Sequence, residues 1–91
     1  IFGSWGAGDS SASGTGWSMS RSGTGLYTIT WTSAFTSSTS YACVAMPDEL
    51  AAGSDQPIIA GISQSATTTV LQGRANTVDF VTGVTFMTAG S

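Results

Sequence analysis

The chain has no lysine, no histidine and only one cysteine, Cys43, among its 91 residues. Without histidine it can build neither a histidine-containing metal site nor a catalytic pair with a histidine base. A single cysteine cannot form a disulfide within the chain. Because a domain of this size has a thin core and lacks these staples, association with further copies is the reinforcement that remains.

Charge is equally scarce. Arg21 and Arg74 are the only cations, and five carboxylates bring the net charge to −3. Two arginines cannot neutralise many phosphates, which excludes nucleic acid as a partner. There is no basic stripe for an anionic membrane surface, and no apolar run approaches the ~18 residues needed to cross a bilayer. We therefore predict no nucleic-acid partner and no membrane insertion.

Catalytic chemistry has few candidate groups. The possible bases are the carboxylates of Asp9, Asp48, Glu49, Asp55 and Asp79. No G-x-S-x-G nucleophile motif and no D-x-[DN]-x-[DN]-G calcium loop is present. Asp48 and Glu49 are adjacent, so they would not face each other across a cleft as paired glycosidase carboxylates do. We predict solvated loop charges, no enzyme, no metal and no cofactor.

The residues that are abundant indicate a folded β domain. Glycine, serine and threonine make up 41 of the 91 residues, yet 41% of the chain is hydrophobic. Disordered chains are poor in β-branched and aromatic residues and rich in charge, which this chain is not. The composition predicts a surface made of hydroxyl groups, as is common in proteins that work outside cells.

The clearest strand follows a glycine-rich turn. Tyr27, Ile29 and Trp31 alternate with leucine and threonines over 25–32, the period-2 pattern of a strand with one apolar face. The preceding 17–21 also alternates, so 17–32 is predicted to form a hairpin through the turn Ser22-Gly23-Thr24-Gly25. The same four residues occur earlier as Ser13-Gly14-Thr15-Gly16, and we interpret both as one turn type used twice.

The remaining strands are short and regularly spaced. They are predicted at 41–46, 57–62, 67–72, where Gly73 closes the strand, and 77–88, where Gly83 is a bulge or break. Six or seven such strands predict an all-β fold, a small antiparallel β-sandwich or barrel-like sheet. Strand 41–46 is apolar on both faces, so it should be central or should meet a partner subunit. Residues 47–53 carry the only helical signal.

We divide the chain into an N-terminal strand or linker segment, 1–16, with a loop at 8–16, and a sandwich domain, 17–91. Cys43 is expected to be a small buried hydrophobe, and Met19, Met46 and Met87 to fill the core. The N-terminus lacks an initiator methionine, which favours a fragment or a product cut from a longer chain. The predicted core consists of Tyr27, Ile29, Trp31, Phe35, Tyr41, Phe80 and Phe86.

Three side-chain roles stay open at this point. Trp5 and Trp17 either belong to the core or expose their rings, which could then stack on a sugar. Asp48 and Glu49 would be partner contacts if the 47–57 loop is exposed. Arg21 either pairs with an acid such as Asp79 or faces solvent.

One stretch suggests a family. The residues Met19-Ser20-Arg21-Ser22-Gly23-Thr24-Gly25-Leu26-Tyr27-Thr28-Ile29-Thr30-Trp31, followed by Ser40-Tyr41-Ala42-Cys43-Val44-Ala45, resemble a module of bacteriophage tail fibres, tailspikes and head-fibre or decoration proteins. The end of the chain, 84–90, is similar to that module's last strand. Trp31 departs from the usual phenylalanine, and 47–57 is longer than expected. The resemblance implies a small β-sandwich, usually trimeric, that forms a rigid tip and has no catalytic role.

These lines lead to one expectation of function. We expect a structural virion module, a fibre or spike tip or a capsid decoration, that mediates assembly and host-surface attachment from the particle surface. Its partners would be its own copies in a homotrimer, other virion proteins and a host-surface glycan. The alternatives are a carbohydrate-binding β-sandwich module and a fragment of a bacterial adhesin.

Overall fold

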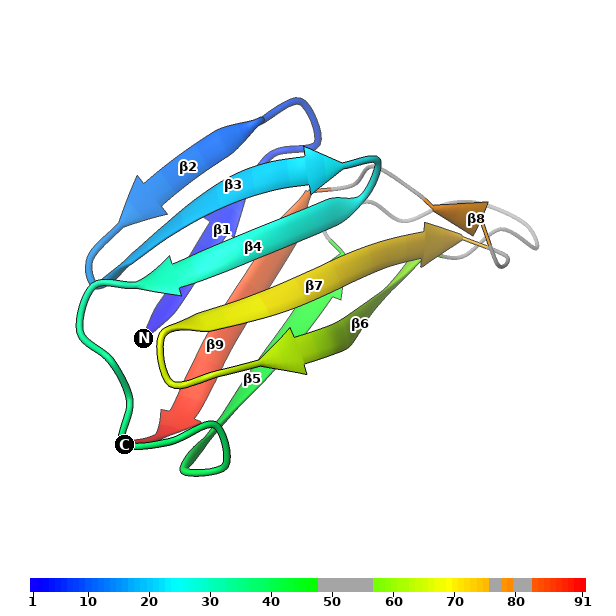
Figure 1. Ribbon diagram of the computed structural model, residues 1–91. Helices are drawn as coiled ribbons and strands as arrows, with labels where there is room; N and C mark the ends of the chain where they lie inside the picture. Colours follow the sequence, from blue (N-terminus) through cyan, green and yellow to red (C-terminus); the bar gives the residue numbers. More distant parts are fainter. Residues whose placement is uncertain (48–56, 76–77, 80–82) are drawn as a thin grey trace.

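A computed structural model describes residues 1–47, 57–75, 78–79 and 83–91 (Figure 1). The described residues contain no helix, and therefore none long and apolar enough to cross a membrane. They form nine strands: β1 Phe2–Trp5, β2 Ser11–Gly14, β3 Trp17–Gly23, β4 Leu26–Trp31, β5 Tyr41–Pro47, β6 Pro57–Gln64, β7 Thr68–Ala75, β8 Val78–Asp79 and β9 Val84–Gly90.

The strands build two sheets with antiparallel pairing throughout the described residues. The smaller sheet has the order β1-β9-β5, and the larger has the order β2-β3-β4-β7-β6 with β8 beside β7. The two sheets lie face to face, and β1 and β9 bring the two ends of the chain together (Figure 1). The predicted all-β sandwich is therefore confirmed, with more strands than the sequence pattern resolved.

Two hairpins of the larger sheet use the same turn. Gly14 pairs with Trp17 around the two-residue loop Thr15-Gly16, and Gly23 pairs with Leu26 around Thr24-Gly25. The second loop residue has a positive φ in both, 87° at Gly16 and 67° at Gly25. Two-residue hairpin loops need such backbone angles, and glycine adopts them at no steric cost. The repeated S-G-T-G sequence is thus one turn used twice, as predicted.

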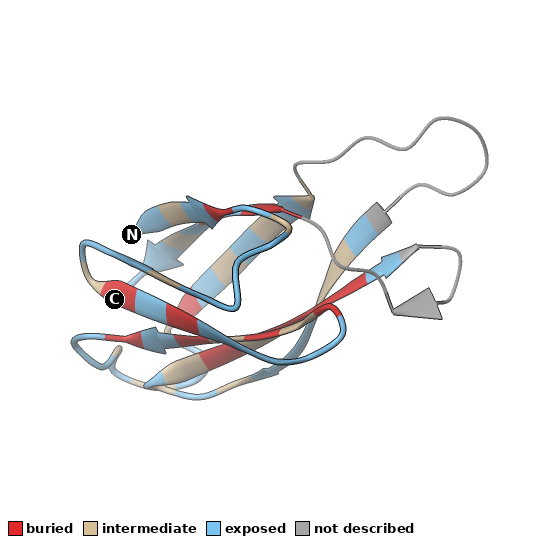
Figure 2. Cartoon of the chain, turned by 90° about the horizontal axis from the view of Figure 1, so that it is seen from above, coloured by how far each residue is buried: buried red, intermediate tan, exposed pale blue. Residues whose placement is uncertain are grey.

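The core lies between the inner faces of the two sheets (Figure 2). Of the predicted core residues, the structure confirms Tyr27, Ile29, Trp31, Tyr41 and Phe86 as buried. Phe35 is only partly buried and packs on this cluster from the β4–β5 connection, with its ring stacked on Tyr41 at a centroid distance of 3.8 Å. Phe80 lies outside the described residues. The core also takes in Trp5, Trp17, Met19, Leu71 and Val84.

The N-terminal segment contributes a strand to each sheet. Residues 8–16 were expected to be loop because nothing there is bulky, but 11–14 form β2, paired with β3. Small side chains do not prevent pairing, since a ladder is held by backbone hydrogen bonds. β1 pairs with β9, and its last residue, Trp5, is in the core.

Three further expectations need correction. Gly73 does not close its strand, because β7 continues to Ala75 and the Gly73 amide donates to the Gly25 carbonyl at 2.7 Å. β5 is not central: it is the last strand in the order β1-β9-β5. Met46 is exposed and does not fill the core. Pro47 ends β5, and the rest of the predicted helical turn at 47–53 lies outside the described residues.

Candidate functional site

The outer face of the small sheet is the most unusual surface of the domain. Side chains alternate along β9, where Val84 and Phe86 point into the core while Met87 is exposed. In the pairing register Met87 lies between Phe2 of β1 and Val44 of β5, so the three side chains form one row across the sheet. The next row holds Ser4, Thr85 and Met46.

We call this surface the outer apolar face: Phe2, Ser4, Ala42, Val44, Met46, Thr85, Met87 and Ala89. Its four large side chains are well exposed: Phe2 at 80%, Met46 at 70%, Val44 at 58% and Met87 at 56%. Between them lies a hollow of about 310 Å³. No member of the face carries a charge.

The opposite side of the sandwich is different along β3 and β4, although Ile58 and Ile62 of β6 are also exposed. Along β3 and β4, the residues that alternate with the buried ones are Ser18, Ser20, Thr28 and Thr30. A half-buried antiparallel sheet normally shows this pattern, apolar inward and polar outward. The small sheet breaks the rule on its outer side, where a contiguous apolar surface marks an interaction site.

The charged residues form no site within the described residues. Arg21 is exposed. The β7–β8 ladder pairs the backbone of Arg74 with that of Asp79, so of the two alternatives for Arg21 the structure supports the solvent-facing one. Asp48 and Glu49, proposed as partner contacts, lie outside the described residues. No three Asp, Glu, Cys or His in the described ranges lie close enough together to hold a metal ion.

Trp5 and Trp17, whose placement the sequence left open, both belong to the core. Each is 4% exposed, and their ring centroids are 6.0 Å apart. Phe86 packs edge-on against Trp17 at 5.0 Å, and Tyr27 lies 5.3 Å from Trp5. A sugar cannot stack on either ring without opening the sandwich. The suggested glycan contact at these two tryptophans is therefore corrected to a structural role.

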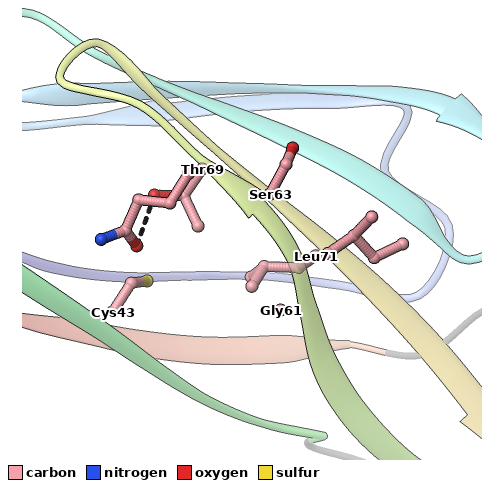
Figure 3. Close-up of a pocket in the computed structure, with 7 residues that line it drawn as sticks. Cys43, Gly61, Ser63, Thr69 and Leu71 are labelled. Atoms are coloured by element: carbon pink, nitrogen blue, oxygen red, sulfur yellow. Dashed lines mark hydrogen bonds between the residues drawn. The ribbon is translucent and has the colours of Figure 1, made fainter. Parts of the chain in front are cut away.

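A second hollow, of about 380 Å³, lies between β5 and β6 and contains the only thiol (Figure 3). Cys43 lines it from β5, and Gly61 and Ser63 line it from β6. Thr69 and Leu71 line it from β7. Gln64 closes one end, because its Nε2 donates to the Tyr41 carbonyl at 2.9 Å. The Thr69 hydroxyl donates to Oε1 of Gln64 at 3.4 Å, so these two polar side chains of the lining are engaged with each other.

We expect Cys43 to react slowly with alkylating reagents. Burial raises the pKa of the Cys43 thiol from its ordinary value of 9.0 to about 11. Since the thiolate is the nucleophile, the native thiol should react with iodoacetamide at pH 8 at least about tenfold more slowly than the unfolded chain. The rate should keep rising with pH up to about 11. Mass spectrometry in buffer and in urea measures both rates, and equal rates would show that the thiol is solvated.

Comparisons with protein-family models, with curated proteins and with solved structures give no match.

Sequence reasoning missed Phe2, Met46 and Met87 as surface residues. Both methionines were expected in the core, where only Met19, 3% exposed, was correctly placed. One signal did point to the outer apolar face. Strand 41–46 is apolar on both sides, which predicted either a central strand or a strand that meets a partner. Because β5 is the last strand of its sheet, the second interpretation is the one that stays open.

Proposed function

We propose that this domain is a structural module that assembles with its own copies through the outer apolar face, in a particle of the phage-fibre type. The observation that supports self-association is the outer apolar face. It has four large, uncharged apolar side chains, 56–80% exposed, on one side of a three-stranded sheet. The setting in a virion, at a fibre or spike tip or as a capsid decoration, is supported only by the resemblance of residues 19–31 and 40–45.

The energetics favour association that depends on concentration. Fully burying a side chain such as Val, Met or Phe contributes about 1.5–3 kcal/mol. Because the face of each copy supplies four partly exposed ones, two faces together gain on the order of 10 kcal/mol. The loss of translational and rotational freedom costs about 4–15 kcal/mol. Association of this strength suits a module tethered in a larger assembly, where effective concentrations are high.

The shape of the sheet is compatible with the expected trimer. Three strands about 4.8 Å apart make a face about 14 Å wide. Three such faces arranged as a prism would each lie about 4 Å from the common axis, close to half of the ~10 Å at which packed sheets are spaced. The side chains of the outer apolar face would then fill the prism, leaving the hydroxyl-rich larger sheet in solvent.

Val44→Glu is expected to abolish the self-association. A carboxylate on β5 within the contact between two faces would have to be buried without a partner, which costs several kcal/mol. Native mass spectrometry and sedimentation of the wild-type protein should show an assembly with the mass of a trimer, and the variant should be a folded monomer. Ser20→Glu, on the exposed side of β3, is the matched control and should assemble like wild type. A wild-type chain that stays monomeric at high concentration would refute the proposal.

A further inference from the structure

We propose that Phe2 of one copy inserts into the hollow above Thr85 on a second copy. This inference rests on the proposed self-association and names the contact that specifies it. It identifies the group that fills the hollow as the Phe2 ring of another copy of this protein.

The hollow has the size and lining for an aromatic ring. It is bordered by Phe2, Val44, Met46, Thr85 and Met87, with Phe86 below. Thr85 and Ser4 are short, while Met46 in the same row and Met87 and Phe2 in the next row are long, so the face is lowest above Thr85 and Ser4. A buried apolar cavity of about 150 Å³ is known to hold benzene. The hollow, at about 310 Å³, therefore has room for a phenyl ring.

Phe2 is the side chain of the face that projects most. It is 80% exposed and stands on β1, one of the two edge strands of the small sheet. An aromatic side chain has few rotatable bonds, so immobilising it costs little entropy for a large contact area. Met46 is exposed nearly as much, but its flexible chain suits the wall of a hollow better than an inserted group.

The face is compatible with a copy of itself. Because it is uncharged, two copies can approach without like-charge repulsion, which a charged face would impose. Ala42 and Ala89 flank the row of Val44, Met87 and Phe2, so the face is low on that side.

The four large side chains present on the order of 400 Å² of apolar surface in each copy, a size at which exposed apolar patches are often functional.

The buried area reaches what a specific contact needs. With the alanines and Ser4, two faces would bury about 1,000 Å² in total, near the lower limit for a specific interface. A reciprocal insertion would relate two copies by a twofold axis, and insertion into the next copy around a ring would relate three. The contact between Phe2 and the hollow is the same in both arrangements.

The direct test is nuclear magnetic resonance on a mixed sample of isotope-labelled and unlabelled wild-type chains. An isotope-filtered experiment detects only contacts between chains, and we expect one between the Phe2 ring and the Thr85 methyl group. An assembled sample without this contact overturns the inference and leaves the proposed function standing. A wild-type chain that does not assemble overturns the proposed function itself.

A variant gives the second measurement. Phe2→Ala should weaken self-association by at least tenfold in sedimentation, because aromatic side chains buried in a pocket of the partner dominate interface energies. Folding is not at risk, since the ring is 80% exposed. Ile58→Ala is the control: Ile58 is 57% exposed but stands on the larger sheet, so the dissociation constant should not change. A Phe2→Ala chain that associates as tightly as wild type overturns the insertion.

Discussion

Replacing Trp31 by alanine is expected to leave much of the protein unfolded at 25 °C. The indole is 3% exposed and touches three rings, with centroid distances of 5.5 Å to Phe35, 6.0 Å to Tyr41 and 5.9 Å to Phe86. Truncating a buried tryptophan costs about 3–5 kcal/mol. A domain of this size is expected near the lower end of the 5–15 kcal/mol that folded proteins have, so the loss removes most of its stability.

A hydrogen-bond hub adds to the packing of Trp31. Its Nε1 donates to the Tyr41 hydroxyl at 2.9 Å, and this hydroxyl in turn donates to the Ser65 carbonyl at 2.6 Å. The Thr69 hydroxyl lies 2.9 Å from the same oxygen. Tyr41 stands on β5 while Trp31 and Thr69 stand on β4 and β7, so the hub ties one sheet to the other. Tyr41→Phe would leave the indole N–H buried without that acceptor, at a cost of about 1–3 kcal/mol.

Urea unfolding followed by far-UV circular dichroism separates the two contributions. Trp31→Ala should lose more than Tyr41→Phe, because it loses both the ring contacts and the hydrogen bond. Ile58→Ala, on an exposed side chain, should stay within about 0.5 kcal/mol of wild type. Protein concentration must be held constant, because self-association would add to the apparent stability. A Trp31→Ala chain less than 1 kcal/mol below wild type would contradict this account.

The period-2 signal predicted the fold where it was strong. Tyr27, Ile29 and Trp31 are all buried on one side of β4, and the glycine turns on both sides of β3 are hairpins. β2 escaped prediction because Ser11 to Gly14 has almost no apolar side chain, and its pairing depends on backbone groups that every residue has. Local pattern therefore identified strands that carry core residues and missed one that does not.

The candidate site was harder to predict because exposure is a property of strand order. The apolar run 41–46 fits equally a central strand and an edge strand that meets a partner, and only the neighbours of β5 decide between them. The same holds for Met87: the sequence shows that it alternates with Phe86, but not that its side of the sheet is exposed. For Trp5 and Trp17 the sequence allowed either burial or exposure, and in the structure both are buried between the two sheets.

Gly3→Ala is expected to cause the other large loss of stability, through the packing of Trp17. The indole of Trp17 lies between two glycines, Gly3 of β1 and Gly14 of β2. A Cβ on Gly3 would overlap Cζ2 of the ring, and a Cβ on Gly14 would lie 2.5 Å from Nε1. Since the ring is held from both sides and is 4% exposed, it cannot move away from the added methyl group. Overpacking of this kind typically costs about 1–3 kcal/mol, and displacing β1 would add to it.

Two variants make this prediction specific to the clash. Gly61→Ala, on β6, meets no atom within 4 Å and has no positive φ, so it should be neutral or stabilise the chain by about 0.4–1 kcal/mol. Gly3→Ala combined with Trp17→Phe should be more stable than the sum of the two single changes predicts, because the smaller ring makes room for the methyl group. Unfolding in urea compares the wild type with Gly61→Ala, with each single change and with the double variant. Strict additivity of the pair would show that Gly3 is needed for a reason other than its contact with Trp17.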